Sequence, residues 1–157
     1  MDLFRSCVVI GLGFWIGGLS LFLGIITPVS FRRFGKDGAG QYLGALFPAV
    51  DRWSMFWGGV SCLGLYGLFL HRHFQIRSLR LEFPVALIYL LSLHAGLVLH
   101  PQITDLRRRI AEPKFAGTAH LEKLRYCFSR LHRRSVQLHA VILLLGWFSI
   151  LLLPWIL

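Results

Sequence analysis

The sequence has few charged residues and very few acidic ones. Charged side chains make up 15% of the 157 residues against 55% hydrophobic ones, and Asp and Glu together number 7. A soluble domain of this length needs more polar side chains to cover its surface. The few carboxylates form no acid/base pair within a long apolar run, which argues against a buried hydrolytic site. The composition therefore excludes an ordinary soluble domain.

Cysteines and catalytic motifs are also scarce. Cys7, Cys62 and Cys127 lie far apart and form no C-x-x-C pair, which argues against a disulfide framework, a thiolate zinc site and c-type haem attachment. The chain has no G-x-S-x-G elbow, phosphate-binding loop or H-E-x-x-H motif. Whether the protein is an enzyme stays open, and the sequence favours a protein that is not.

The positive charge lies between long uncharged runs. The 17 Lys and Arg residues give a net charge of +10, but they do not form one repeated basic face of the kind that binds nucleic acid. Cations that flank apolar runs are typical of membrane proteins. We therefore expect anionic lipid head groups as partners and no nucleic acid.

Four runs without charge are long enough, or nearly so, to cross a bilayer as helices. They are too long for strands and lack the alternation of a β-barrel. The first is expected to be a retained helix and not a cleaved signal, and the second to extend backward through residues 38–50, which include Pro48. We predict an all-α, polytopic membrane protein, a four-transmembrane-helix bundle forming a single domain over residues 1–157. The spans are predicted at about residues 6–31, 53–70, 83–104 and 135–157.

The distribution of cations predicts the orientation. With four spans, both termini share a side with the second loop, which holds only Arg5, Arg72, Arg77 and Arg80, whereas the other 13 of the 17 cations lie in the first and third loops. Lys and Arg are enriched in cytoplasmic loops. We therefore predict a multi-pass protein of the bacterial inner membrane, with both termini outside and loops one and three in the cytoplasm.

Two flanking segments have helical spacing of apolar residues. Residues 43–50 and 120–134 precede the second and fourth spans and carry apolar side chains three or four residues apart. We expect both to be amphipathic helices at the cytoplasmic membrane surface, with their cations near the head groups. Asp51 lies between residues 43–50 and the second span, and it is expected to pair with the adjacent Arg52.

Small residues predict where the helices pack. Close approach of small side chains replaces the hydrophobic drive that helices lack in lipid. The first span has a stripe of such residues, and the second has two at the same spacing, so we expect these faces to bring the two helices together, or to form a homodimer. The expected packing residues are Gly13, Gly17, Ser20, Gly24, Gly58 and Cys62.

Four histidines lie in or near the third and fourth spans, where ionisable groups indicate function by default. His100 lies seven residues before Arg107, and His139 lies five residues after Arg134. Both are therefore roughly 8–10 Å inside the predicted cytoplasmic charge belt at a rise of about 1.5 Å per residue. His100 and His139 are the preferred cofactor or metal ligands, and His132 and His94 are substitutes.

Short motifs resemble a small membrane family of unknown function that includes eukaryotic transmembrane protein 205 and bacterial relatives. They are residues 15–18 and 27–31 of the first span, residues 39–40 and 46–48 after it, residues 100–103 and 106–107, and residues 128–135. The resemblance implies a four-helix membrane bundle and no settled reaction. It also implies an Asn at position 139, where this chain has His139.

Three functions fit these patterns. In the first, the protein is a non-catalytic subunit or scaffold of a larger membrane complex, or a lipid-interacting protein, and the histidines form hydrogen bonds between helices. In the second, His100 and His139 bind a b-type haem or a transition metal. In the third, an oligomer transports a small solute or ion, although four helices without an internal repeat are few for a carrier.

Overall fold

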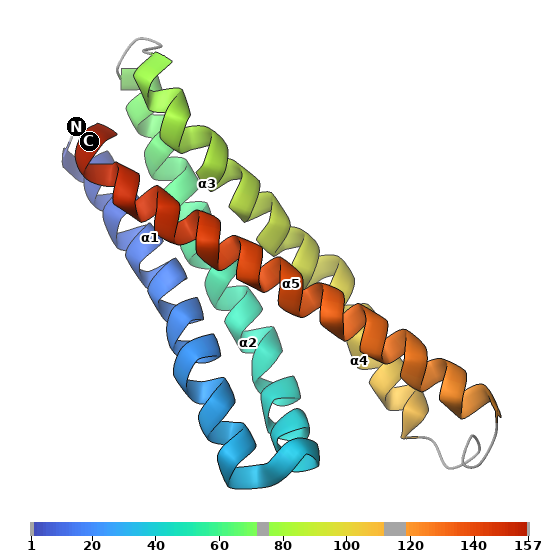
Figure 1. Cartoon of the computed structure of the whole chain (residues 1–157). Coiled ribbons are helices and arrows are strands. Elements are labelled where there is room, and N and C mark those ends of the chain that lie inside the picture. Colours follow the sequence, from blue (N-terminus) through green and yellow to red (C-terminus); the bar gives the residue numbers. More distant parts are fainter. Residues whose placement is uncertain (1, 72–75, 112–118, 157) are drawn as a thin grey trace.

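The computed structural model describes residues 2–71, 76–111 and 119–156, and the chain is helical over almost all of them (Figure 1). This confirms the predicted all-α class. Figure 1 shows α1 and α2 as an antiparallel hairpin, α3 and α4 running alongside α5, and both termini at one end. The elements in order are α1 Asp2–Leu21, η1 Phe22–Ile26, α2 Thr27–His71, α3 Ile76–His94, η2 Ala95–Leu99, α4 His100–Ile110 and α5 Ala119–Ile156.

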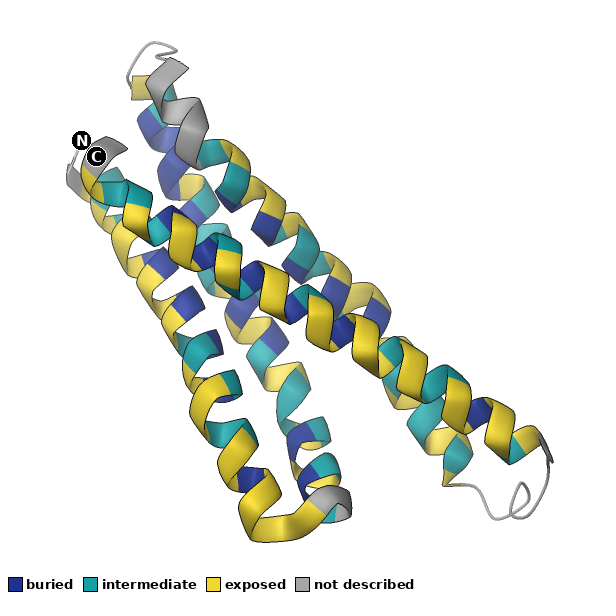
Figure 2. Ribbon diagram, viewed as in Figure 1, coloured by how far each residue is buried: buried dark blue, intermediate teal, exposed yellow. Residues whose placement is uncertain are grey.

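Four helical stretches are long and apolar enough to cross a membrane. They cover Leu3–Gly35, Gly38–His71, Glu82–Ile110 and His120–Pro154, while the last residue of the fourth predicted span, Leu157, lies outside the described residues. Large apolar side chains such as Leu63 and Leu144 point outward, with 70% and 73% of their surface exposed. Figure 2 shows exposed residues along the outer faces of every helix. An apolar exterior of this extent is typical of a protein that lipid surrounds, so the chain is a multi-pass membrane protein.

The first two spans join directly through a tight turn at Gly35. This residue has a φ of 66°, a left-handed conformation that glycine adopts without steric cost. The helix that follows includes Pro48 and continues to His71, as the backward extension of the second span predicted. The amphipathic segments 43–50 and 120–134 are continuations of α2 and α5 and not separate helices. Below, the basic end of the bundle means the end that holds the turn at Gly35 and the last turn of α4.

Two π-helical turns interrupt the spans. Phe22–Ile26 follows α1, where the Thr27 hydroxyl donates a hydrogen bond to the Phe22 carbonyl at 3.0 Å. Ala95–Leu99 lies between α3 and α4. Such turns accommodate one extra residue and occur frequently at functional sites. Both lie in the half of the bundle toward the basic end.

The predicted contact of α1 with α2 through Gly13, Gly17 and Gly24 is wrong. A Cβ atom at any of these three positions would meet nothing within 4 Å, because they lie on the outward face of α1. The helices do pack together, but through Gly11 and Gly18, whose Cβ atoms would lie 2.4 Å from the Ser61 hydroxyl and 2.6 Å from the Trp53 ring, respectively. A dimer through the outward face stays a prediction.

The other predicted packing residues have different partners. Gly58 is close-packed, since its Cβ would lie 2.6 Å from the Tyr89 ring of α3 and 3.1 Å from the Trp15 ring of α1. Ser20 contacts α5, where the Trp147 indole donates a hydrogen bond to its hydroxyl at 3.1 Å. Cys62 is half-buried and lines a cavity between α2 and α3.

Candidate metal centre

Asp51, His100 and His139 meet in the interior of the bundle, one each from α2, α4 and α5. All three are buried, with 8%, 8% and 5% of their surface exposed. Each offers one ligand atom, and these atoms lie within 4.8 Å of one another. Because buried ionisable groups are costly in a membrane, a cluster of three indicates function.

His100 is held between a carboxylate and a hydroxyl. Its Nδ1 atom bonds to Asp51 Oδ2, and Ser135 Oγ lies 3.3 Å from its Nε2. An Nδ1–H that donates to Asp51 leaves Nε2 to accept the hydrogen bond of the Ser135 hydroxyl. The expected Asp51–Arg52 pair is therefore wrong, because the carboxylate turns inward to His100 while Arg52 lies on the exposed side of α2.

His139 is fixed by the backbone of its own helix. Its Nδ1 lies 2.8 Å from the Ser135 carbonyl oxygen, so Nδ1 carries the proton and Nε2 presents a lone pair. A histidine that ligates a metal commonly donates its other ring N–H to a carbonyl or carboxylate in this way. His139 has this arrangement, since its Nδ1–H donates to the Ser135 carbonyl and leaves Nε2 for a metal.

Aromatic packing and a glycine shape the site. The His100 and His139 rings stack with their centroids 5.6 Å apart and their planes at 15°, and the Phe47 ring contacts both, at 4.8 and 6.1 Å. A Cβ at Gly96 would lie 3.2 Å from the Asp51 Cβ, so the absence of a side chain in η2 lets α2 approach. The neighbouring π-helical turn ends directly before His100.

This arrangement suits a single ion better than a haem. Bis-histidine haem ligation needs open space for the porphyrin between the two imidazoles, whereas the Phe47 ring contacts both His100 and His139. Ligands of a tetrahedral zinc ion lie about 3.4 Å apart, from bond lengths near 2.1 Å. The three ligand atoms would therefore need shifts on the order of an ångström to share one ion. Two imidazoles and a carboxylate are a donor set for first-row divalent metals.

The connected Asp51, His100 and Ser135 also repeat the order of a hydrolytic triad, but the local backbone does not support that chemistry. Ser135 lies inside α5, a continuous helix from Ala119 to Ile156. Its own N–H is therefore used within the helix, whereas acyl transfer needs free N–H groups to stabilise the oxyanion.

The other two candidate histidines lie outside the cluster. His94 is exposed on α3. His132 is exposed on α5, about two helical turns before His139, where its ring stacks on Phe128 with centroids 5.9 Å apart. Asp51 was missed as a ligand because it lies 49 residues from His100 and beside a cation. A carboxylate next to the uncharged second span was the signal for it.

Comparison with known proteins gives a family and no function. No curated protein and no solved structure matches the chain. A family model described as a domain of unknown function (DUF4149) matches residues 10–112, which include Asp51 and His100 but not Ser135 or His139. Because this match covers well over half of the chain, the protein belongs to the DUF4149 family of uncharacterised proteins.

Proposed function

We propose that the protein is a membrane metal-binding protein that holds one first-row divalent transition metal ion between Asp51, His100 and His139. The observation that carries the proposal is the convergence of these three ligands from three helices in the bundle interior. A bound cation would balance the Asp51 carboxylate, whose burial in a bilayer is otherwise costly. It would take the place of the Asp51–His100 contact, with His139 Nε2 beside it as the nitrogen that has no partner among the described residues.

A packing role for the histidines explains less of the site. Hydrogen bonds between membrane helices average only about 0.6 kcal/mol, and a serine–histidine pair supplies one without any charge. The carboxylate of Asp51 goes beyond what packing requires, as does the orientation of His139 by the Ser135 carbonyl. Both features are those of metal ligands with an ordered outer shell.

The proposed role is that of a non-catalytic, metal-binding subunit of the membrane. The cluster lies toward the basic end, whose cations we propose face the cytoplasm and its anionic lipids. The metal would then be exchanged with the cytoplasm. A reporter enzyme that is active only in the cytoplasm, fused to the N-terminus, checks this orientation. If the fusion is active, the proposed orientation is wrong. We also propose that the protein is related to eukaryotic transmembrane protein 205.

Metal content of the purified protein tests the proposal. The protein in mild detergent is stripped with a chelator, reloaded separately with Zn²⁺, Co²⁺ and Ni²⁺, desalted and analysed for bound metal. Absorption spectra of the oxidised and dithionite-reduced protein, taken before stripping, check for haem. We expect about one ion per chain and a Co²⁺ d–d absorption band, since cobalt adopts zinc sites.

Matched histidine variants separate the site from general metal affinity. His100→Gln, His139→Gln and Asp51→Asn are each expected to lose stoichiometric metal, while His94→Gln, a lipid-facing histidine at the end of α3, should retain it. A folded, metal-free wild-type protein would contradict the proposal. So would equal loss of metal in the His94 and His100 variants, and the cluster would then be a packing contact.

A further inference from the structure

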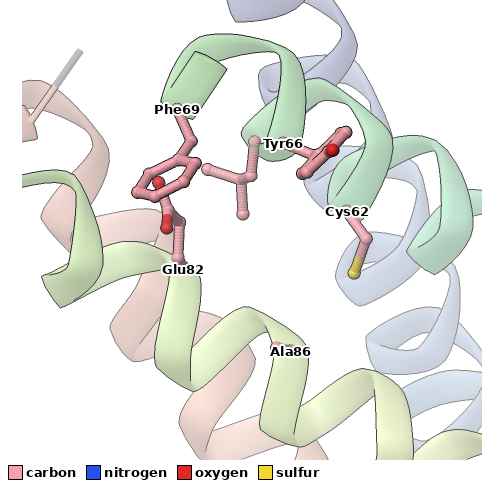
Figure 3. Close-up of a pocket in the computed structure, with 6 residues that line it drawn as sticks. Cys62, Tyr66, Phe69, Glu82 and Ala86 are labelled. Carbon is pink, nitrogen blue, oxygen red and sulfur yellow. The ribbon is translucent and has the colours of Figure 1, made fainter. Parts of the chain in front are cut away.

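A second site lies between α2 and α3, far from the metal ligands. It is an open cavity of about 230 Å³ lined by Cys62, Leu65, Tyr66, Phe69, Glu82 and Ala86, of which Tyr66 and Ala86 are exposed. Figure 3 shows Cys62, Tyr66 and Phe69 on one helix and Glu82 and Ala86 on the other. Its α2 residues follow Asp51 by 11 to 18 positions, which is about 16–27 Å along the helix axis. The proposed metal ion therefore cannot reach it.

Glu82 gives this cavity an unsatisfied polar group. Its Oε1 atom is buried and has no hydrogen-bond partner among the described residues. Most of the remaining lining is apolar, from Leu65, Ala86 and the Cys62 side chain. A carboxylate in such surroundings costs free energy unless a donor or a cation pairs with it. Glu82 is half-buried, and a positively charged or hydrogen-bonding ligand would satisfy its buried oxygen.

Two aromatic rings select the kind of cation. Tyr66 and Phe69 line the cavity with Glu82, and aromatic faces attract organic ammonium groups through cation–π interactions. The apolar lining offers no hydrogen bonds to a hydrated inorganic ion. Pockets of this type bury an apolar ligand body and orient it by a few polar groups. The volume is below the roughly 300–1,000 Å³ usual for drug-sized ligands, so the ligand is small.

We infer that this cavity binds an organic ammonium group attached to a small apolar body, with Glu82 as its counter-ion and Tyr66 and Phe69 as its aromatic wall. The site is independent of the proposed metal centre. Phe69 lies two residues before the end of α2 at His71, so the cavity is near the end of a span. The ammonium therefore has two sources, a soluble hydrophobic amine or the ethanolamine head group of a lipid.

Cys62 provides a reporter inside the cavity. In a Cys7→Ser/Cys127→Ser background, it is the single thiol of the chain. The protein is placed in nanodiscs of phosphatidylglycerol, and the rates of its modification by ethylammonium and sulfonatoethyl methanethiosulfonates are compared. Glu82 is expected to favour the cationic reagent by about tenfold or more, as for a hydrogen bond to a charged group. Phenethylamine is expected to slow both reactions.

Two variants and a matched control assign the effect to the cavity. Glu82→Gln should remove the preference for the cationic reagent and the protection by phenethylamine, whereas Glu122→Gln, at an exposed position of α5, should retain both. Ala86→Phe fills the cavity without changing its charge and should also remove the protection. Equal rates for the two reagents in the parent background would overturn the proposal, as would loss of the preference in the Glu122 variant.

The lipid arm distinguishes the two sources. If a head group is the ligand, replacing half of the phosphatidylglycerol with phosphatidylethanolamine slows modification of Cys62 without added amine. If the ligand is a soluble amine, only phenethylamine does so. Protection by neither contradicts the inference. Because no arm involves a metal, the outcome is separate from that of the metal-loading experiment.

Discussion

Gly11→Ala is expected to weaken the contact between α1 and α2, while Gly13→Ala, two residues along the same helix, is not. A Cβ at Gly11 would lie 2.4 Å from the Ser61 hydroxyl, 3.0 Å from the Ser61 backbone nitrogen and 3.1 Å from the Trp57 carbonyl oxygen. Two of these atoms belong to the backbone, so the helices must move apart. The Ser61 hydroxyl would also be displaced from its hydrogen bond to the Trp57 carbonyl.

The expected magnitude follows from comparing the two variants. Replacing glycine by alanine within a helix gains about 1 kcal/mol of intrinsic propensity, and both positions share this gain. Only Gly11→Ala adds the cost of overpacking, typically about 1–3 kcal/mol. Gly11→Ala should therefore be less stable than Gly13→Ala by that amount, while Gly13→Ala is as stable as the wild type or more so.

Unfolding in mixed micelles measures the difference. Sodium dodecyl sulfate is titrated into the protein in mild detergent, and the loss of helix is followed by circular dichroism. The two midpoints and slopes give the free-energy difference directly. The reasoning would be refuted if Gly13→Ala lost as much stability as Gly11→Ala, since the motif glycine would then be the packing residue.

Two further predictions concern the site and the contact of α1 with α5. Gly96→Leu should weaken zinc binding by about 10–100-fold, as loss of outer-shell support does. The reason is that its Cβ would lie 2.3 Å from the Met55 methyl and 3.2 Å from the Asp51 Cβ. A zinc titration measures the affinity, and an unchanged affinity would contradict the role given to η2. The Trp147–Ser20 hydrogen bond should contribute about 0.6 kcal/mol in a double-mutant cycle of Trp147→Phe and Ser20→Ala, and additive effects would show that it contributes nothing.

The spans could be predicted because the bilayer imposes a simple rule on the sequence. A spanning segment must satisfy its backbone hydrogen bonds internally and keep charged side chains out of the hydrocarbon. Uncharged runs such as residues 83–104 therefore mark a spanning helix directly. The uncharged run alone does not mark the helix end, but the sequence also predicts that the third helix continues through residues 105–111, and α4 extends to Ile110. Four of the six residues 105–110 are charged yet continue α4, since a helix that leaves the bilayer needs no apolar residues to remain helical.

The site could be predicted in part. Counting residues from the charge belt gave the similar depth of His100 and His139, which do meet. Asp51 required knowledge of how α2 faces α4, and this depends on contacts between distant segments. The small-residue stripe was misleading for the same reason. Gly13 and Gly17 fit the spacing, but spacing alone does not say which face of α1 meets a neighbour, and the large buried Trp15 and Ile16 lie on the inner one.

The extra residue in Ala95–Leu99 has a consequence for comparing this chain with its relatives. In a regular α-helix, Ser92 and His100 would diverge by roughly 80° over eight residues at about 100° each. Both are nevertheless buried, because the wider turn of η2 removes roughly that angle. A relative one residue shorter here would keep its histidine on the same face in a regular α-helix, because seven residues at about 100° each leave only about −20°. A relative of the same length without the wider turn would rotate its histidine by about 80°, toward lipid. A gap of one residue in this segment is therefore compatible with retention of the site, and the helix type here matters as well as the identity of position 100.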